Sequence, residues 1–390
     1  MKIDNLKKVH LVGILGSGLS ALAKAFKSRG IEVSGSDIAL SGHEKENVPK
    51  DVNCLVYTVA AHLDNPEIQY AKELGIPVFS YPEMLGYISK NLFTIAIAGT
   101  HGKTTTTNMI GKILTDAGLD PLVIAGGAMQ NGNNSMYGKG KYFVVEACEY
   151  RRSFLNLRPD IAIITNIDND HLDYYKNIEE IKNAFDEFVN NLKDGGKVIR
   201  NFENNEYQKL LKLKIPGEHN VKNAMKALGA ALELGISGEM AIKSLNNFSG
   251  VKRRFEFKGK NKNGALIFDD YAHHPTEVGA TLRAAKEKYP DLKLLVFFQP
   301  HLYSRARDHL EQFAEKLKIA DEVVLLPIYA SREKFDPTIT SADLALKINQ
   351  TDGNAKVMSI AEATEFIKTL PPSSLALTMG AGDVYKIWGT

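Results

Sequence analysis

The feature that most constrains this chain is the stretch FTIAIAGTHGKTTTT, which begins with the apolar run Phe93–Ala98. A turn with Gly99 and Gly102 follows the run, and then a helical pattern begins at Lys103 and Thr104. Such a turn points successive backbone N–H groups inward at a helix N-terminus, which is how proteins hold phosphates. The lysine is expected to contact the β- and γ-phosphate oxygens, and the threonine to ligate Mg²⁺. The stretch therefore predicts an ATP site at the end of a buried strand.

The match to the usual phosphate-loop pattern is not literal. Ile97 stands where G-x-x-x-x-G-K-[ST] has its first glycine, and Gly99 is an additional one. The alternative is a plain strand–turn–helix with an incidental lysine. Gly-Lys-Thr directly after an apolar run favours phosphate binding, while the detailed type of the loop stays open.

Size and composition limit the other possibilities. A chain of 390 residues predicts two or three domains. Its net charge is +2 and its lysines and arginines are scattered, so neither nucleic acid nor an anionic membrane is expected as the main partner. Cys54 and Cys148 are the only cysteines, which argues against a disulfide framework. With no apolar stretch of membrane-spanning length, we expect a cytoplasmic protein without membrane insertion.

The N-terminal pattern predicts a βαβ unit. Val9–Ile14 is expected to be a strand, Leu19–Ser28 a helix and Ile31–Ser34 a second strand, with Asp37 just beyond it. The turn 16–18 places glycines where a phosphate approaches in a Rossmann half. However, the spacing of its glycines is not G-x-G-x-x-G. From these residues alone, a nucleotide site and a tight turn into a packed helix remain equally open.

Strand and helix patterns alternate through the rest of the chain, which predicts mostly parallel sheets and an α/β fold. We predict three domains, comprising residues 1–91, 92–249 and 250–390. Charged and glycine residues gather around Ser249–Lys262, which indicates a hinge between the last two domains.

Polar residues follow two further predicted strands. One strand ends at Glu146, and the other leads to Asp168, Asp170 and His171. Because parallel strands deliver their carboxyl ends to one edge of a sheet, these groups are expected near the phosphate loop. Oxygen ligands from Glu146 and Thr104 suit Mg²⁺. An imidazole is a less usual ligand, so His171 is either a capping residue or, as the adjacent carboxylates favour, a metal ligand.

Six motifs together resemble the Mur ligase family of peptidoglycan synthesis, over nearly the whole chain. They are GTHGKTTTT at 99–107, TNIDNDHLD at 165–173, GEHNVKNA at 217–224, GVKRRFE at 250–256, DDYAHHPTE at 269–277 and QPHLYSR at 299–305. The resemblance implies an N-terminal Rossmann-like domain that binds a UDP-sugar, a central P-loop-type doubly wound sheet, and a Rossmann-like C-terminal domain. It also implies an ATP-dependent acid–amino acid ligase that joins L-alanine to the lactyl carboxylate of UDP-N-acetylmuramate through an acyl phosphate.

The resemblance assigns roles to individual residues, with ATP and two Mg²⁺ ions as cofactors. The residues expected to bind ATP are Gly99, Thr100, Gly102, Lys103, Thr104, Thr105, Asn220, Asn223, Arg254 and Asp270. The expected metal ligands are Thr104, Glu146 and His171. The residues expected to bind the other substrates are Gly16, Ser17, Gly18, Ser20, Asp37, His101, Asn166 and His301. Lys103, Glu146, His171, His273 and Arg305 are expected to be catalytic.

Arg305 is the expected partner of the alanine carboxylate, because a guanidinium pairs well with that group. His273 is expected to touch substrate, whereas His274 is as readily explained by packing against Pro275. Cys148 stands where the family commonly has an acidic residue, so the role of the neighbouring Glu149 is left open.

Other departures and alternatives remain. Leu302 stands where many members of the family have arginine, and residues 38–53 and 200–217 replace longer segments. One alternative activity is the recycling ligase that attaches a whole tripeptide to the same acceptor. A second is a nucleotide-sugar-binding protein that has lost catalysis, and a more distant third is an oxidoreductase. The expected state is a monomer or a homodimer.

Overall fold

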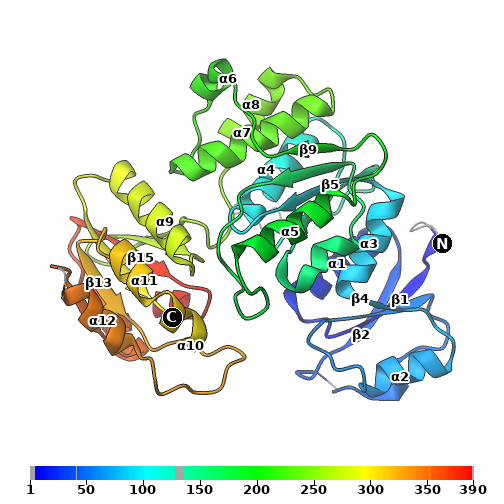
Figure 1. Ribbon diagram of the computed structural model, residues 1–390, viewed down its shortest axis with the longest axis horizontal. Helices are drawn as coiled ribbons and strands as arrows, with labels where there is room; N and C mark the ends of the chain where they lie inside the picture. Colours follow the sequence, from blue (N-terminus) through cyan, green and yellow to red (C-terminus); the bar gives the residue numbers. More distant parts are fainter. Residues whose placement is uncertain (1–4, 41, 128–135, 351, 389–390) are drawn as a thin grey trace. The chain divides into compact units, whose positions relative to one another are not determined.

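The computed structural model describes residues 5–40, 42–127, 136–350 and 352–388. It is a mixed α/β fold with three sheets (Figure 1). Backbone contacts divide the chain into two units, Met1–Lys212 with Lys222–Phe248, and Leu213–Val221 with Ser249–Thr390. None of the helices within the described residues is long and apolar enough to span a membrane.

The N-terminal sheet is four-stranded and parallel, in the order β2-β1-β3-β4. Its strands are β1 (Lys8–Val12), β2 (Glu32–Ser36), β3 (Cys54–Tyr57) and β4 (Val78–Ser80), and its helices are α1 (Ser17–Ser28), α2 (Pro66–Glu73) and α3 (Tyr81–Asn91), with the short 3-10 helix η2 (Lys45–Asn47). The α/β prediction is confirmed, although β1 ends two residues before the predicted Ile14. The chain leaves the strand there because Gly13 adopts φ 86°, which opens the turn into α1.

The central sheet has the order β6-β7-β5-β8-β9 and is also parallel. Its strands are β5 (Phe93–Ala98), β6 (Leu122–Ile124), β7 (Tyr142–Ala147), β8 (Ile161–Ile164) and β9 (Lys197–Ile199). Its helices are α4 (Lys103–Asp116), η3 (Tyr150–Asn156), α5 (Ile178–Val189), α6 (Asn205–Leu210), α7 (Glu218–Glu233) and α8 (Gly238–Asn246). Figure 1 shows α4 and α5 on opposite sides of β5. β5 lies in the middle of the sheet, and ligands of doubly wound folds bind at the carboxyl ends of such central strands.

The first two sheets share one continuous core. The buried cluster runs from Val9 and Leu11 of β1 through Met84 and Ile88 of α3 to Ala96 of β5. Helix α3 also packs closely on η3, since a Cβ placed at Gly86 would lie 2.5 Å from the carbonyl oxygen of Asn156. This packing explains why both sheets fall into one contact unit.

The C-terminal sheet has six strands in the order β10-β11-β15-β12-β13-β14. The strands are β10 (Glu256–Lys260), β11 (Leu266–Asp270), β12 (Lys293–Phe298), β13 (Glu322–Leu325), β14 (Ala355–Val357) and β15 (Ser374–Met379). The helices are α9 (Pro275–Lys288), α10 (Tyr303–Asp308), α11 (Leu310–Leu317), α12 (Ser341–Asn349), α13 (Ile360–Thr369) and η4 (Val384–Ile387). Part of the predicted hinge Ser249–Lys262 is in fact β10, an antiparallel edge strand whose pairing with β11 is irregular between Phe257 and Gly259.

Candidate functional site

The phosphate loop joins β5 to α4 and depends on two glycines. Gly99 has φ 135° and Gly102 has φ 81°, a region that other residues rarely adopt. A Cβ at Gly99 would collide with the hydroxyl of Thr165, and one at Gly102 would lie 2.7 Å from the side-chain oxygen of Asn223. The first turn of α4 carries no acidic residue, so its N–H groups and positive end of the helix dipole are suited to an anion.

Lys103 is held by a carboxylate to which the sequence had assigned no role. Its ammonium donates to Thr100 O at 3.1 Å and to Glu149 Oε2 at 2.9 Å. Glu149 is only 2% exposed. Burial alone would lower the pKa of Lys103, but the Glu149 charge outweighs burial and raises the pKa above its usual value. The loop therefore holds a permanent cation whose counter-ion lies just beyond the end of β7.

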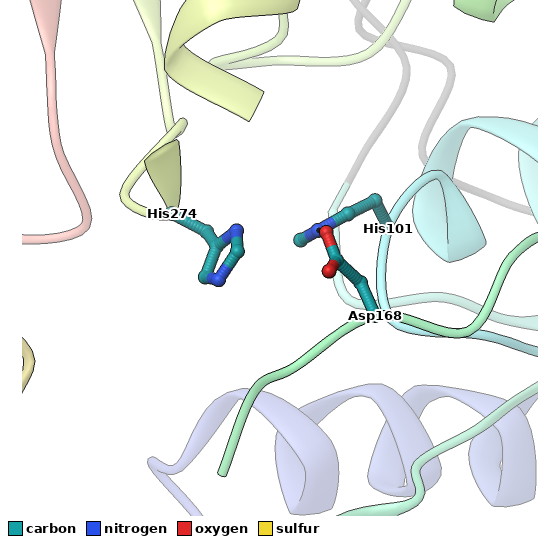
Figure 2. Close-up of side chains that lie close together, drawn as sticks. All are labelled: His101, Asp168 and His274. Carbon is teal, nitrogen blue, oxygen red and sulfur yellow. Dashed lines mark hydrogen bonds and ion pairs between the residues drawn. The ribbon is translucent and has the colours of Figure 1, made fainter. Parts of the chain in front are cut away.

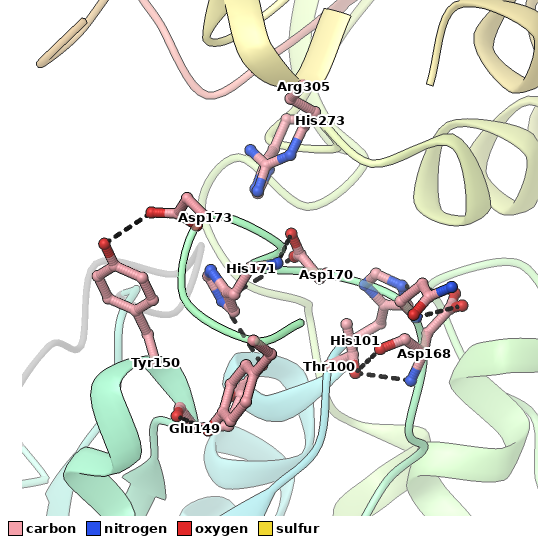
Figure 3. A network of polar contacts seen from close by, with 12 residues as sticks. Thr100, His101, Glu149, Tyr150, Asp168, Asp170, His171, Asp173, His273 and Arg305 are labelled. Carbon is pink, nitrogen blue, oxygen red and sulfur yellow. Dashed lines mark hydrogen bonds and ion pairs between the residues drawn. The ribbon is translucent and has the colours of Figure 1, made fainter. Parts of the chain in front are cut away.

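The predicted metal ligands fall into two places. The Thr104 hydroxyl and the Glu146 carboxylate both flank Gly126, whose Cβ would lie 3.4 Å from the first and 3.1 Å from the second. The third, His171, has its Nε2 3.7 Å from Glu149 Oε1 (Figure 3). One hydroxyl and two carboxylates are the hard oxygen donors that Mg²⁺ prefers, so the residues present fit this ion. Glu149 belongs to the candidate set, and its place directly after β7 was the sequence signal for it.

The loop after β8 braces the phosphate loop. Asn166 Oδ1 accepts a hydrogen bond from the backbone N–H of His101 at 2.9 Å, and the Thr100 hydroxyl accepts one from the N–H of Asp168 at 2.9 Å. The His101 ring in turn lies 3.2 Å from the Asp168 carboxylate (Figure 2). These contacts account for His101 and Asn166 as supports of the loop, and their contact with substrate remains a prediction.

A cavity of about 640 Å³ lies in the first unit beside the phosphate-loop helix. Its lining includes the predicted substrate residues Gly16, Ser17, Gly18 and Ser20, together with Lys24, Tyr81, Glu146, Cys148, Tyr150 and Ser153. Gly18 is needed there because a Cβ would lie 2.9 Å from the Tyr81 ring. Asp37 is not among the lining residues. Its carboxylate instead accepts a hydrogen bond from the N–H of Leu15 at 3.1 Å and so steadies the turn that opens α1.

In the second unit, Asp270 ends β11 in a buried position. Its two carboxylate oxygens accept hydrogen bonds from the N–H groups of Phe255 and Ala272, both at 2.7 Å. Burial raises the pKa of Asp270 to about 6, although the nearby Arg254 opposes the shift. Arg254 also lies over the Tyr271 ring at 5.3 Å. Asp270 thus fixes the turn that carries Arg254, and its contact with ATP remains a prediction.

The structure brings three more predicted residues together in the second unit. The rings of His273 and His301 lie 5.8 Å apart, and Arg305 Nη1 lies 3.5 Å from His301 Nδ1. Tyr329, which lies outside the sequence motifs, stacks its ring on that of His301 with centroids 5.9 Å apart. The His274 ring accepts a hydrogen bond from the N–H of Thr276 and so caps α9, and the choice between packing and substrate contact for this residue remains open.

The two asparagines predicted to bind ATP, Asn220 and Asn223, are both buried on α7. Asn223 packs against Gly102 of the phosphate loop within the first unit. Asn220 belongs to the second unit, where its amide donates to Pro216 O at 2.6 Å. The phosphate-loop residues therefore form one set in the first unit, while Arg254, Asp270, His273, His301 and Arg305 form another in the second.

Comparison with known proteins bears on both units. Three family models match in succession: the Mur ligase family catalytic domain at residues 8–92, the Mur ligase middle domain at 97–213, and the Mur ligase glutamate ligase domain at 253–382. Among solved structures, UDP-N-acetylmuramate-alanine ligase from Thermotoga maritima matches with a TM-score of 0.79 and 28% identity, covering 97% of each chain. A murein peptide ligase from Psychrobacter arcticus matches at 23% identity with a TM-score of 0.65, which shows a shared fold.

Curated relatives are similar along their whole length. UDP-N-acetylmuramate–L-alanine ligase from Clostridium acetobutylicum is 38% identical over 451 positions, covering 99% of this chain and 98% of the relative. The protein of the same name from Acetivibrio thermocellus is 38% identical, covering 98% and 95%. An alignment of 451 positions exceeds the 390 residues of this chain, so at least 61 residues of the first relative have no counterpart here. Matches of this extent show that the chain belongs to the Mur ligase family.

Proposed function

We propose that this Mur ligase joins L-alanine to the lactyl carboxylate of UDP-N-acetylmuramate, with ATP converted to ADP and phosphate. The observation that carries the proposal is the 38% identity to alanine ligases over nearly the whole chain. It is supported by a phosphate loop that presents Lys103 and α4 to an anion beside a cavity large enough for part of a nucleotide sugar. The curated relatives thus also favour alanine over a tripeptide as the amine.

The proposed chemistry follows from the weakness of a carboxylate as an acylating agent. Transfer of the γ-phosphoryl group to the lactyl carboxylate forms an acyl phosphate and releases ADP. The amine of alanine then attacks the acyl carbon, and the tetrahedral intermediate expels phosphate to leave the amide. Positioning and charge stabilisation carry most of such a reaction.

The residues of the first unit would divide this work. Lys103 would neutralise charge on the transferring oxygens once the incoming phosphate replaces Glu149 as its partner. Thr104, Glu146, Glu149 and His171 would hold Mg²⁺, which supplies Lewis-acid stabilisation of the phosphoryl oxygens. Two Mg²⁺ ions would suit these donors, because one set flanks Gly126 and the other lies at His171.

The second unit would supply the amine. Arg305 would pair with the alanine carboxylate, and His273 and His301 would line the same site, consistent with their close packing. Arg254 and Asp270 would serve the nucleotide side, with Asp270 setting the turn that presents the arginine. The cytoplasmic location and the monomeric or homodimeric state remain predictions.

ADP release in the presence of UDP-N-acetylmuramate and different amines tests this proposal. L-alanine should support turnover, with glycine and L-serine as weaker substrates and the tripeptide inactive. Turnover with the tripeptide alone would establish the recycling activity instead. Binding of the UDP-sugar without product from any amine would indicate a protein that has lost catalysis.

A further inference from the structure

Tyr150 lies between the cavity and the imidazole of His171. It lines the cavity. Its ring also packs on the His171 ring, with centroids 4.8 Å apart and planes inclined by 37°. Its hydroxyl donates a hydrogen bond to Asp173 Oδ2 at 2.9 Å (Figure 3). One side chain therefore touches both the space proposed for the acceptor and a proposed metal ligand.

The backbone around Tyr150 is held firmly in an unusual conformation. Arg151 and Arg152, the next two residues, have φ of 50° and 56°, a left-handed region that non-glycine residues rarely adopt. Such strain persists only where the surroundings enforce it, and it is common at functional sites. Here Phe154 anchors the segment, because its ring stacks on Phe188 at 4.8 Å in the core. Tyr150 is thus presented from a rigid turn.

The His171 side of the contact is a tight turn. His171 has φ 57°, its N–H donates to Asp170 Oδ1 at 2.7 Å, and its carbonyl accepts from the N–H groups of Tyr174 and Tyr175 at 2.9 Å. These bonds fix the backbone but leave the rotation of the imidazole to its neighbours. The neighbours include the Tyr150 ring against one face, with Glu149 Oε1 at 3.7 Å and Asp170 Oδ2 at 4.0 Å from Nε2. The two carboxylates attract Nε2, and the Tyr150 ring limits the rotation of the imidazole from its face, so the direction in which Nε2 points depends in part on Tyr150.

We propose that Tyr150 is a positioning residue that couples acceptor binding to divalent-cation binding, an inference that rests on the proposed function. An acceptor in the cavity restrains the Tyr150 ring, and the restrained ring holds the imidazole of His171 in its ligating orientation beside Glu149. Coupling of this kind is reciprocal, so the cation tightens acceptor binding by the same factor. The simpler explanation, that Tyr150 only fills space, predicts no dependence of one ligand on the other.

The test is a titration of the full-length protein with Mn²⁺, followed by the electron paramagnetic resonance of the free ion, with and without UDP-N-acetylmuramate. In the wild type the UDP-sugar should tighten Mn²⁺ binding about tenfold, within the usual range of such couplings. Tyr150→Ala should reduce the factor to about one. Tyr150→Phe keeps the ring and should retain most of the coupling. Leu172→Ala is the control and should leave the coupling unchanged, because this exposed residue of the same loop is not among the cavity-lining residues.

Each outcome decides the proposal. A coupling factor in Tyr150→Ala equal to that of the wild type would overturn it, provided that circular dichroism shows the variant folded. A wild type that binds both ligands independently would overturn it as well. If the wild type joins alanine to the acceptor but shows no coupling, the proposed function stands and only the role of Tyr150 falls. If it binds no UDP-sugar at all, the proposed acceptor and the coupling both fall.

Discussion

Glu67→Ala is expected to destabilise the N-terminal sheet strongly, because Glu67 is the common acceptor of a buried polar network. The carboxylate is fully buried at the first turn of α2. Oε2 lies 2.8 Å from His10 Nε2 and accepts from the Ser36 hydroxyl at 2.8 Å. Oε1 lies 3.2 Å from His43 Nδ1 and accepts from the Asn47 amide at 3.1 Å.

The expected magnitude depends on which donors can reach water after the change. His10 and Ser36 are each 1% exposed, whereas the His43 side chain is 17% exposed. The Ser36 hydroxyl also lies 3.0 Å from His43 Nδ1 and keeps that partner, so His10 Nε2 is the buried group that is stranded. Stranding a buried polar group costs about 1–3 kcal/mol, which is the loss we expect for Glu67→Ala. In Glu67→Gln the remaining amide oxygen can still accept hydrogen bonds from His10 and Ser36. The new amide nitrogen then faces the more exposed His43. We expect it to cost about 1–2 kcal/mol.

Amide hydrogen exchange of the whole protein measures this effect locally. Peptides covering β1 and β2 should lose protection in the order wild type, Glu67→Gln, Glu67→Ala. Peptides of the C-terminal sheet serve as an internal reference and should not change. Glu73→Gln, an exposed change on the same helix, should leave β1 and β2 protected. A loss below about 1 kcal/mol in Glu67→Ala would refute the reasoning, since it would mean that the stranded group finds another partner.

The same network predicts a pH dependence. Burial would raise the pKa of Glu67, but hydrogen bonds from His10, Asn47 and Ser36 outweigh it and lower the pKa below the ordinary 4.5. A carboxyl group whose pKa is lower in the folded than in the unfolded state contributes its full stabilisation at any pH above the unfolded-state pKa. That contribution is lost as the pH falls through the folded-state pKa. The advantage of the wild type over Glu67→Gln should therefore be constant above pH 4.5 and shrink below it.

Three further predictions concern other parts of the chain. Lys103→Ala should lower kcat in an ADP-release assay about 10²- to 10³-fold by removing a preorganised charge, whereas Lys112→Ala on the same helix should not. Equal rates for the two variants would contradict the proposed role of the loop. Gly86→Ala should cost about 1–3 kcal/mol in urea unfolding, because its Cβ would meet Asn156 O, and an unchanged midpoint would show that α3 and η3 are not packed so closely. The pKa of Asp270, raised from 3.8 to about 6, means that the folded state binds the proton more tightly. The free energy of unfolding of the wild type relative to Asp270→Asn should thus fall as the pH rises from 4 to 6, by about 3 kcal/mol at most. If the difference between the two unfolding free energies does not change with pH, Asp270 is not buried in this way.

Local features were well predicted because their physics is local. A strand that ends in a glycine turn before a helix is visible in the residues themselves, and the structure has β5, the turn and α4 at the expected positions. The apparent fault at Ile97 has the same explanation. Ile97 is fully buried in β5, and Gly99, with its positive φ, is the glycine that the turn requires.

Other features depend on contacts between distant segments. The sequence pointed to Glu146 as the carboxylate of the loop and left Glu149 open, yet Glu149 is the partner of Lys103. Glu146 lies within β7, and its carboxylate bonds to the N–H of Gly126, whereas Glu149 lies beyond the strand, where the chain turns back towards the loop. The spacing of two carboxylates along a chain does not tell which one faces a given cation.

The amino-acid sequence by itself determined the α/β class, the phosphate loop and the family, because each rests on residues that are adjacent in the chain or on motifs in a given order. Only the tertiary structure decided the counter-ion of Lys103, the stacking of Tyr150 on His171, and the network of Glu67 with His10. The paired residues lie 21–57 positions apart in the chain and come from different strands and turns. The distances between their side chains are therefore set by tertiary packing.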